Sequence, residues 1–337
     1  MLNQTSSLEL SHYPVMLDEV IKICSPTNGG TYLDCTFGGG SYSKKLLTFS
    51  NTKVLALDRD KFVLNIAKEL EKKYPDRFTF FQKKFSDVSS VINNPEIDAV
   101  IFDLGLSSIQ LNNLQRGFSF KSKETLDMSM GLTSLSAEEV INKYSEQKLK
   151  LIIKILGEEK EASRIVKNII KARSIKKISK VYQLVEIIEK SKKKNYKSKI
   201  NPSTKTFQAL RIFVNKEISE LIYGLINATK VLKKGGILGV VTFHSLEDKI
   251  VKYFFKSLSE NKSISRYSPV TEQAETLLNL IQKKPILPSD EEISENPPSR
   301  SAKFRYAIKK SDFYTFDTDI ENQFRNLIEI ENYGDKL

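Results

Sequence analysis

The chain has 337 residues, of which 40% are hydrophobic and 28% charged, a composition typical of a globular protein with one large or two moderate domains. No apolar run reaches the roughly 18 residues of a membrane-spanning helix, and residues 1–11 lack the basic start and apolar core of a signal peptide. Two cysteines, Cys24 and Cys35, are too few for a disulfide framework or a four-cysteine zinc site. We therefore expect a cytoplasmic protein without a membrane segment.

Residues 31–104 alternate between strand and helix patterns. Apolar runs at residues 31–37, 54–57, 77–82 and 97–102 predict four strands, and apolar residues at helical spacing predict helices at residues 41–49 and 62–74. Strands separated by helices of this length indicate a parallel sheet with right-handed crossovers.

The pattern is purely helical from about residue 136 to 191, and strand character returns at residues 236–243 after a helical stretch at 206–232. Weaker strand candidates follow at residues 264–269 and 302–308, with a loop between them at Pro297 and Pro298. The simplest organisation is a helical domain, residues 105–206, inserted into an α/β domain made of residues 1–104 and 207–337.

The net charge of +12 is concentrated in the predicted insertion. Residues 105–206 hold 22 Lys and Arg against 10 Asp and Glu, whereas the rest of the chain holds 31 of each. Such an excess indicates a polyanionic partner, either nucleic acid or an anionic membrane surface. The densest run fits RNA phosphates with one stacked base, but it also fits a solvated loop between helices. It contains Lys192, Lys193, Lys194, Tyr196, Lys197 and Lys199.

A glycine-rich turn follows the first predicted strand. Asp34 stands near the strand end, and Gly38 and Gly40 let the backbone turn tightly and approach a ligand. Asp58 ends the second strand, where a carboxylate can accept both hydroxyls of a ribose. A dinucleotide fingerprint requires glycine where this chain has Ser43, and Asp34 would repel a pyrophosphate. The carboxylate would attract the ammonium and sulfonium groups of S-adenosylmethionine, so the motif favours that cofactor over NAD. The remaining alternative is a glycine-rich turn that binds no ligand.

Two further residues end strands at the same predicted sheet edge. Asp103 follows the fourth strand, beside the first, where we expect it to face cofactor and substrate; the alternative is a helix cap or turn residue. His244 follows the strand at 236–243 and is either an orienting or proton-accepting group near a target amine, or a structural hydrogen-bonding residue. Because His12 is the only other histidine and no cysteine is near His244 in sequence, we expect no catalytic metal.

Arg211 and Asn215 lie four residues apart on one predicted helical face. They fit contacts with an RNA phosphate or base, and they fit equally a role in tying the helical domain to the sheet.

These motifs, in this order, resemble the RsmH (MraW) family of bacterial S-adenosylmethionine-dependent methyltransferases, which act on the N4 amine of a cytidine in the decoding centre of 16S ribosomal RNA. The matching stretches are residues 12–19, 34–40, 56–60, 102–108, 115–120, 126–128, 157–159, 206–215, 242–248 and 295–297. The resemblance covers residues 12–308 and implies a Rossmann-like class I methyltransferase sheet with an inserted all-helical domain. The family commonly has Gly-His where this chain has Ser41-Tyr42, and Arg and Asp where it has Ser129 and Gly131.

The resemblance also implies roles for individual residues. The cofactor contacts would be Gly40, Ser41, Tyr42, Asp58, Phe85, Asp103 and Gln110. We expect Asp103 to accept the N–H of the cytosine amine and His244 to orient it. The implied partner is 16S ribosomal RNA in the small ribosomal subunit, with self-association left open. The alternatives are methylation of another RNA position or of a protein amine, and a non-catalytic ribosome-assembly factor that retains the fold.

Overall fold

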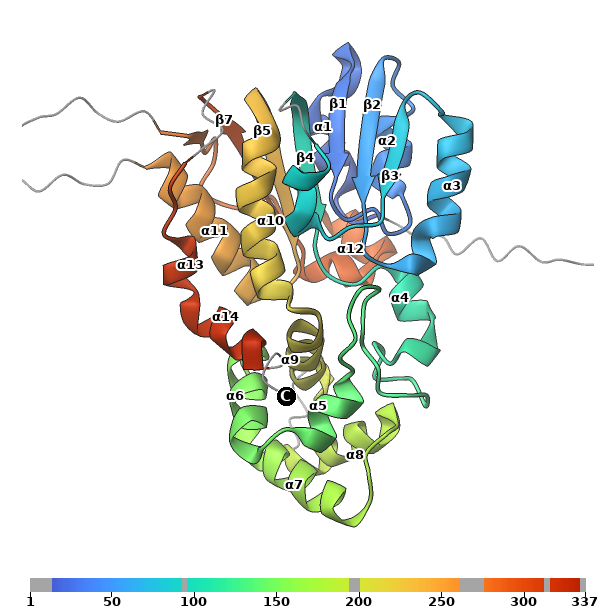
Figure 1. The fold of residues 1–337 in the computed structure, drawn as a ribbon, viewed down its shortest axis with the longest axis vertical. Coiled ribbons are helices and arrows are strands. Elements are labelled where there is room, and N and C mark those ends of the chain that lie inside the picture. Colours follow the sequence, from blue (N-terminus) through green and yellow to red (C-terminus); the bar gives the residue numbers. More distant parts are fainter. Residues whose placement is uncertain (1–13, 93–95, 194–200, 261–275, 312–315, 334–337) are drawn as a thin grey trace, which may run out of the picture.

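Figure 1 shows the computed structural model as a sheet flanked by helices, with a second group of helices below it. The structure describes residues 14–92, 96–193, 201–260, 276–311 and 316–333. The strands are β1 (Gly30–Asp34), β2 (Thr52–Leu57), β3 (Phe78–Phe81), β4 (Ile97–Asp103), β5 (Leu232–Thr242), β6 (Leu278–Asn279) and β7 (Lys303–Lys309). The helices are α1 (Leu17–Cys24), α2 (Ser41–Leu46), α3 (Leu64–Lys73), α4 (Ser108–Asn112), α5 (Ala137–Lys143), α6 (Glu146–Leu156), α7 (Ala162–Ile175), α8 (Val181–Ser191), α9 (Thr204–Asn215), α10 (Glu217–Val231), α11 (Ser245–Ser259), α12 (Asp290–Glu295), α13 (Ile320–Gln323) and α14 (Arg325–Glu331).

The strands form one sheet in the order β3-β2-β1-β4-β5-β7-β6. Strands β1 to β5 are parallel, and β7 runs antiparallel to both β5 and β6. The predicted α/β class and the pairing of the first and fourth strands are thereby confirmed. Strand β5 begins four residues before the predicted start at residue 236. The strand candidate at 264–269 lies outside the described residues.

Alternation of side chains along the strands builds a core on each face of the sheet. Leu33, Val100 and Phe102 belong to the cluster on the face where α10 and α11 pack. Tyr32 and Ile101 belong to the cluster on the other face, which α1, α2 and α3 cover. Because both faces are covered, the parallel strands are apolar throughout, and only their ends are open to a ligand.

The second group consists of α5 to α9, and we call it the helical lobe. Helix α9 packs on α5 and α6, and their buried side chains join the core of the α10 face. The proposed domain boundary at residue 206 falls within α9, and this packing favours placing α9 with the lobe. The carboxyl ends of the parallel strands point towards the lobe (Figure 1), so the space between sheet and lobe is the place to look for a site. Within the described ranges, no helix is long and apolar enough to cross a membrane.

Candidate active site

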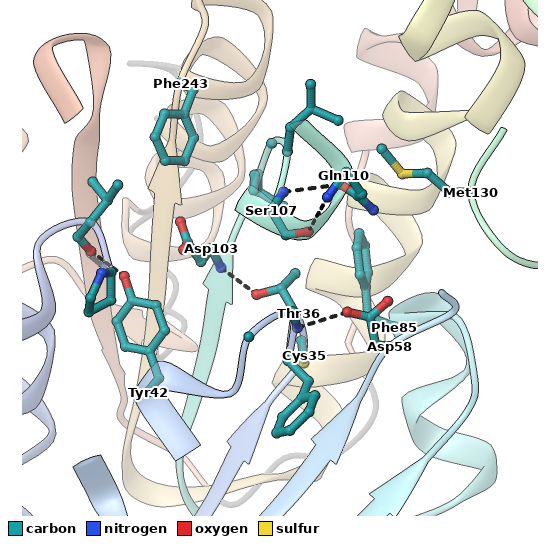
Figure 2. A pocket seen from close by; sticks show the side chains of 18 of the residues that line it. Cys35, Thr36, Tyr42, Asp58, Phe85, Asp103, Ser107, Gln110, Met130 and Phe243 are labelled. Carbon is teal, nitrogen blue, oxygen red and sulfur yellow. Dashed lines mark hydrogen bonds between the residues drawn. The ribbon is translucent and has the colours of Figure 1, made fainter. Parts of the chain in front are cut away.

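A cavity of about 510 Å³ lies at the carboxyl ends of β1, β2, β4 and β5. Figure 2 shows Asp58, Phe85, Asp103, Gln110 and Phe243 around it, each carried by a different strand end or connecting segment. The other five predicted cofactor residues line the cavity or lie beside it, as described below. They are Asp34, Gly38, Gly40, Ser41 and Tyr42. This placement follows the general rule that open α/β sheets bind ligands in the crevice outside the carboxyl ends of their strands.

Asp58 is held by the glycine turn. Its Oδ2 accepts a hydrogen bond from the Gly38 N–H at 2.9 Å, and its Oδ1 accepts one from the Asp60 N–H at 2.8 Å. Burial raises the pKa of the Asp58 carboxyl above its ordinary value, while these two backbone donors lower it in part. Each carboxylate oxygen keeps a further lone pair, so a fixed Asp58 can still accept the hydroxyls of a ribose.

Gly40 shapes the turn from outside the cavity wall. Its φ is +75°, and a Cβ at this position would lie 2.8 Å from the Phe37 ring. Any other residue would strain the turn that begins α2, because L side chains rarely adopt this conformation. The predicted cofactor residues Ser41 and Tyr42 follow directly and do line the cavity, with the Tyr42 hydroxyl donating to the Val15 carbonyl.

We expected Asp34 to attract the cofactor directly, but its side chain does not face the cavity. Its side chain is fully buried behind the turn and is not among the residues that line the cavity. It accepts hydrogen bonds from the Ser43 hydroxyl at 2.6 Å and the Thr36 N–H at 3.2 Å. Burial raises the pKa of Asp34 to about 6, partly offset by these donors. Asp34 therefore holds the turn in shape, and Ser43, which replaces the third glycine of a dinucleotide motif, is its partner.

Asp103 is the most exceptional polar group in the cavity. Its backbone N–H donates to Thr36 Oγ1 at 2.7 Å, which places the side chain at the cavity wall (Figure 2). Its Oδ1 is buried and has no hydrogen-bond partner among the described residues. Burial, followed by the charges of Asp34, Glu247 and Glu292, raises the pKa of Asp103 well above its ordinary value. A buried carboxylate oxygen without a donor is costly, so this atom fits a ligand that brings an N–H group or a positive charge.

Phe85 and Gln110, both predicted from the family resemblance, line the cavity on the side of Asp58. Phe85 packs edge-on against Phe102, with ring centroids 5.3 Å apart, so its ring orientation is fixed. Gln110 caps α4 by accepting from the Ser107 N–H and donates to Asp60 Oδ2 at 3.0 Å. An aromatic face and a ribose-accepting carboxylate on one side, with an orphan carboxylate oxygen on the other, fit the adenosine and the cationic end of S-adenosylmethionine.

His244 does not line the cavity, so the prediction that it orients the substrate amine directly is not supported by its position. It is the N-cap of α11, where its Nδ1 accepts from the Glu247 N–H at 3.4 Å, and its Nε2 lies 3.0 Å from Glu247 Oε1. Its neighbour Phe243, which sequence reasoning missed, faces the cavity instead (Figure 2). The signal was an aromatic residue one position beyond the end of a buried strand.

Glu217, His244 and Glu247 bring three possible metal ligands within 4.8 Å of one another. Arg211 lies in the same cluster and donates to Glu217 Oε2 through Nε and Nη2, at 3.1 and 2.8 Å. Its guanidinium also lies 3.9 Å from Glu247 Oε1, so it offsets the charges of the buried Glu247 and the partly exposed Glu217. His244 Nδ1 accepts the α11 cap bond, whereas His244 Nε2 and Glu217 Oε1 are buried without a hydrogen-bond partner among the described residues. Arg211, Glu217 and Glu247 form an ion-pair network in this cluster, and the absence of a catalytic metal stays a prediction.

Arg211 and Asn215 lie where the alternative to RNA binding placed them. The Asn215 side chain is buried, accepts from the Met130 N–H at 2.8 Å and donates to the Met128 carbonyl at 2.8 Å. These bonds tie α9 to the segment that crosses the cavity, and they leave the amide no free face for RNA. Arg211 lines the cavity but is held by Glu217. Arg211 connects the lobe to α10 and α11, and the Asn215 side chain connects α9 to residues 128–130; an RNA contact by either residue stays a prediction.

The basic run is only partly described. Lys192 donates to Glu159 Oε2 at 2.6 Å and to the Pro202 carbonyl at 2.8 Å, so its ammonium is an internal connection and not a free phosphate contact. Lys193 is exposed. The predictions for Lys194, Tyr196, Lys197 and Lys199 lie outside the described residues. The outer face of α7 carries further exposed cations, Arg164, Lys167 and Lys171, at helical spacing.

The sheet order, with its antiparallel last strands, and the cavity between Asp58 and Asp103 define a class I S-adenosylmethionine-dependent methyltransferase. The model of the MraW methylase family matches residues 9–310. The chain belongs to the MraW methylase family.

Curated relatives agree with this membership. Ribosomal RNA small subunit methyltransferase H of Rickettsia massiliae (strain Mtu5) is 44% identical over 300 residues, which are 88% of this chain and 97% of the relative. The protein of the same name from Neorickettsia sennetsu (strain ATCC VR-367 / Miyayama) is 42% identical over 302 residues, 89% of this chain and 97% of the relative.

Among solved structures, an rRNA methylase from Streptococcus thermophilus matches with a TM-score of 0.41 and 10% identity, over 87% of this chain and 95% of that chain. A SAM-dependent O-methyltransferase from Thermotoga maritima matches with a TM-score of 0.35 and 11% identity, over 90% of this chain and 74% of that chain. At this level of similarity the solved structures carry no argument about function.

Proposed function

We propose that this enzyme transfers a methyl group from S-adenosylmethionine to the N4 amine of a decoding-centre cytidine in bacterial 16S ribosomal RNA. The observation that carries the proposal is Oδ1 of Asp103, which has no hydrogen-bond partner among the described residues and lies in the cavity wall across from Asp58 (Figure 2). The relatives named ribosomal RNA small subunit methyltransferase H, which this chain matches over 88% of its length, support the ribosomal substrate. The N4 position and the particular cytidine rest on the family resemblance.

The residues of the cavity divide the work. S-adenosylmethionine supplies an activated methyl group when it is bound. Asp58 would accept the ribose hydroxyls, and Phe85 and Gln110 would form the wall beside the adenine. Much of the rate acceleration then comes from alignment of the two reactants, which the rigid strand ends provide.

Asp103 is the group we assign to the target amine. The lone pair of a cytosine amine is conjugated with the ring, so the nitrogen attacks well only when an acceptor holds one of its N–H groups and takes the proton. The raised pKa of Asp103 makes it a stronger base than an exposed carboxylate. A positive charge in the cavity lowers that pKa and keeps the base form available. Phe243 offers an aromatic surface at the same end of the cavity, against which an extruded base can stack.

His244 acts through other residues in this proposal. By capping α11 it fixes Glu247, whose Oε2 accepts from the Phe243 N–H at 2.8 Å. Burial alone would raise the pKa of Glu247, but His244, Arg211 and this backbone donor hold it below its ordinary value. The charged Glu247 thus holds the backbone that presents Phe243, and His244 is a positioning residue.

The helical lobe is the part we assign to RNA. The surplus of positive charge lies in residues 105–206, and the outer face of α7 presents Lys167 and Lys171 to solvent, beside Arg164, which pairs with Glu161. Lys193 and the basic residues that follow it extend this charge in sequence. A basic lobe beside a strand-end cavity can hold the phosphate backbone while one base enters the cavity.

A turnover assay tests the proposal. Purified enzyme and S-adenosylmethionine are incubated with small ribosomal subunits from cells that lack this protein, and with free 16S RNA alongside. Mass spectrometry of the digested RNA is expected to show new N4-methylcytidine at one position. Methylation of a different RNA atom or of a ribosomal protein would replace the proposed substrate, and no turnover on either form would indicate an assembly factor.

A further inference from the structure

Arg116 belongs to a stretch, residues 115–120, that matches the family closely but does not line the cavity. Its side chain is 7% exposed and pairs with Asp60, whose side chain is 2% exposed, at 2.5 Å. The guanidinium lies over two aromatic rings, 4.7 Å from the centroid of Phe62 and 5.0 Å from that of Phe118. This ion pair holds one geometry because both charges are buried, and moving either partner would leave the other without its counter-charge.

Asp60 connects this ion pair to the cofactor residues. Its backbone N–H donates to Asp58 Oδ1 at 2.8 Å, and its own Oδ2 accepts from Gln110 Nε2 at 3.0 Å. Asp60 Oδ1 accepts from the Phe62 N–H and so caps the turn that follows. One side chain therefore joins the proposed ribose acceptor, one cavity wall residue and Arg116.

Arg116 also contacts a second segment that lines the cavity, residues 128–130. Its Nη2 donates to the Ser129 carbonyl at 2.9 Å, and its carbonyl accepts from the Met128 N–H at 2.9 Å. The next residue, Met130, lines the cavity and appears at its edge in Figure 2. Arg116 thus holds the backbone of residues 128–130 in place through main-chain atoms of that segment.

Two departures from the family pattern, Ser129 and Gly131, lie in or next to this segment. Arg116 uses the carbonyl of Ser129, so the side chain at this position is free to differ. Gly131 has a φ of +50°, and a Cβ there would lie 1.7 Å from the Arg59 carbonyl oxygen. The segment therefore lies directly on the backbone of the loop after β2, at a place where an Asp would not fit.

We propose that Arg116 is a positioning residue for the cofactor: with Asp60 it clamps the segments carrying Gln110 and Met130 onto the Asp58 loop and so forms the wall of the cofactor cavity. This inference rests on the proposed function for the identity of the cofactor. Its consequence is that the affinity for cofactor depends on a residue that touches no part of the cavity.

The test compares Arg116→Met and Arg116→Lys with wild type by calorimetric binding of S-adenosylhomocysteine, the product form of the cofactor. By analogy with outer-shell residues that orient metal ligands, whose loss costs about 10- to 100-fold in affinity, Arg116→Met is expected to bind S-adenosylhomocysteine at least about ten times more weakly. Arg116→Lys keeps the charge opposite Asp60 but cannot also reach the Ser129 carbonyl. Its affinity for S-adenosylhomocysteine should therefore lie between those of wild type and Arg116→Met. In steady state the KM for S-adenosylmethionine should rise while kcat at saturation stays near wild type.

Arg77→Met is the matched control. Arg77 donates to the Leu47 carbonyl at 3.0 Å and the Phe49 carbonyl at 2.9 Å, so this substitution also removes a multiply bonded arginine. It should lower the melting temperature without changing affinity for S-adenosylhomocysteine. Wild-type affinity in folded Arg116→Lys and Arg116→Met would overturn the inference, as would an equally weakened affinity in Arg77→Met. If Arg116→Met does not fold, wild-type affinity in Arg116→Lys alone overturns it. Failure of the wild type to bind S-adenosylhomocysteine would instead remove the proposed function.

Discussion

Replacing Asp103 by Asn removes the proposed proton acceptor while keeping nearly the same shape. A general base contributes about 10²- to 10⁴-fold to a rate, so kcat for methylation should fall by that factor, or about 3–5 kcal/mol of transition-state stabilisation. The variant should fold at least as stably as wild type, because the native carboxyl is buried without a partner for Oδ1 among the described residues and close to Asp34 and Glu247. A fall in activity would then not reflect unfolding.

The pH dependence supplies the second readout. The carboxyl must be ionised to accept a proton, so the wild-type kcat/KM should rise with pH through the pKa of Asp103, and burial places that rise above the ordinary range of a carboxyl. The residual activity of Asp103→Asn should not show this rise of kcat/KM with pH. Methyl transfer is measured with labelled S-adenosylmethionine on small ribosomal subunits between pH 5 and 9. If the variant loses cofactor affinity but keeps kcat at saturation, Asp103 serves the cofactor only and our assignment is refuted.

Three further sets of variants test separate features of the protein. Asp58→Ala would remove the two charge-assisted hydrogen bonds that we assign to the ribose, and it should weaken S-adenosylmethionine binding by about 10²- to 10⁴-fold in calorimetry. Replacing Lys167 and Lys171 by Ala should weaken binding to 16S RNA and flatten the dependence of log K on log salt by about 0.9 for each phosphate that is no longer neutralised. Burial raises the pKa of Glu331 to about 7, so its contribution to stability is present below the unfolded value near 4.5 and declines as pH rises through 7. Glu331→Gln should remove up to about 3 kcal/mol of this decline in the free energy of unfolding, which chemical denaturation at a series of pH values measures.

Matched variants give each of these a control. Asp87 is exposed on the turn after β3, and Asp87→Ala should leave cofactor affinity unchanged. Lys68 and Lys72 are exposed on α3, and their replacement by Ala should leave the salt slope as in wild type. Equal effects in test and control variants would show that the named side chains have no special role. For Glu331, an unchanged pH profile in the variant would mean that another group governs it.

The strand pattern and the residues at strand ends were sufficient to predict the fold and the position of the cavity. Asp58 and Asp103 stand at the ends of buried parallel strands, and parallel strands bring their carboxyl ends to one edge, so both carboxylates were expected to line one cavity. Asp34 shows the limit of that reasoning. It ends β1 in the same way, but its side chain points behind the turn, where Ser43 binds it.

Residue types alone did not show which charged groups were already paired. Lys192 looked like part of a phosphate-binding run, but Glu159, far away in sequence, occupies its ammonium. Asn215 and Arg211 share a helix face, as spacing predicted, yet their partners come from the segment around Met130 and from Glu217. Such pairs depend on which segments the fold brings together, and no local pattern encodes that.

The central claim is that Asp103 serves methyl transfer to a cytidine amine of 16S ribosomal RNA. The most direct measurement is mass spectrometry of 16S RNA from cells lacking this protein that are complemented with either wild type or Asp103→Asn. We predict that N4-methylcytidine returns with wild type and stays absent or strongly reduced with the variant. Full restoration by Asp103→Asn, or N4-methylcytidine that never disappears when the protein is missing, would contradict the claim.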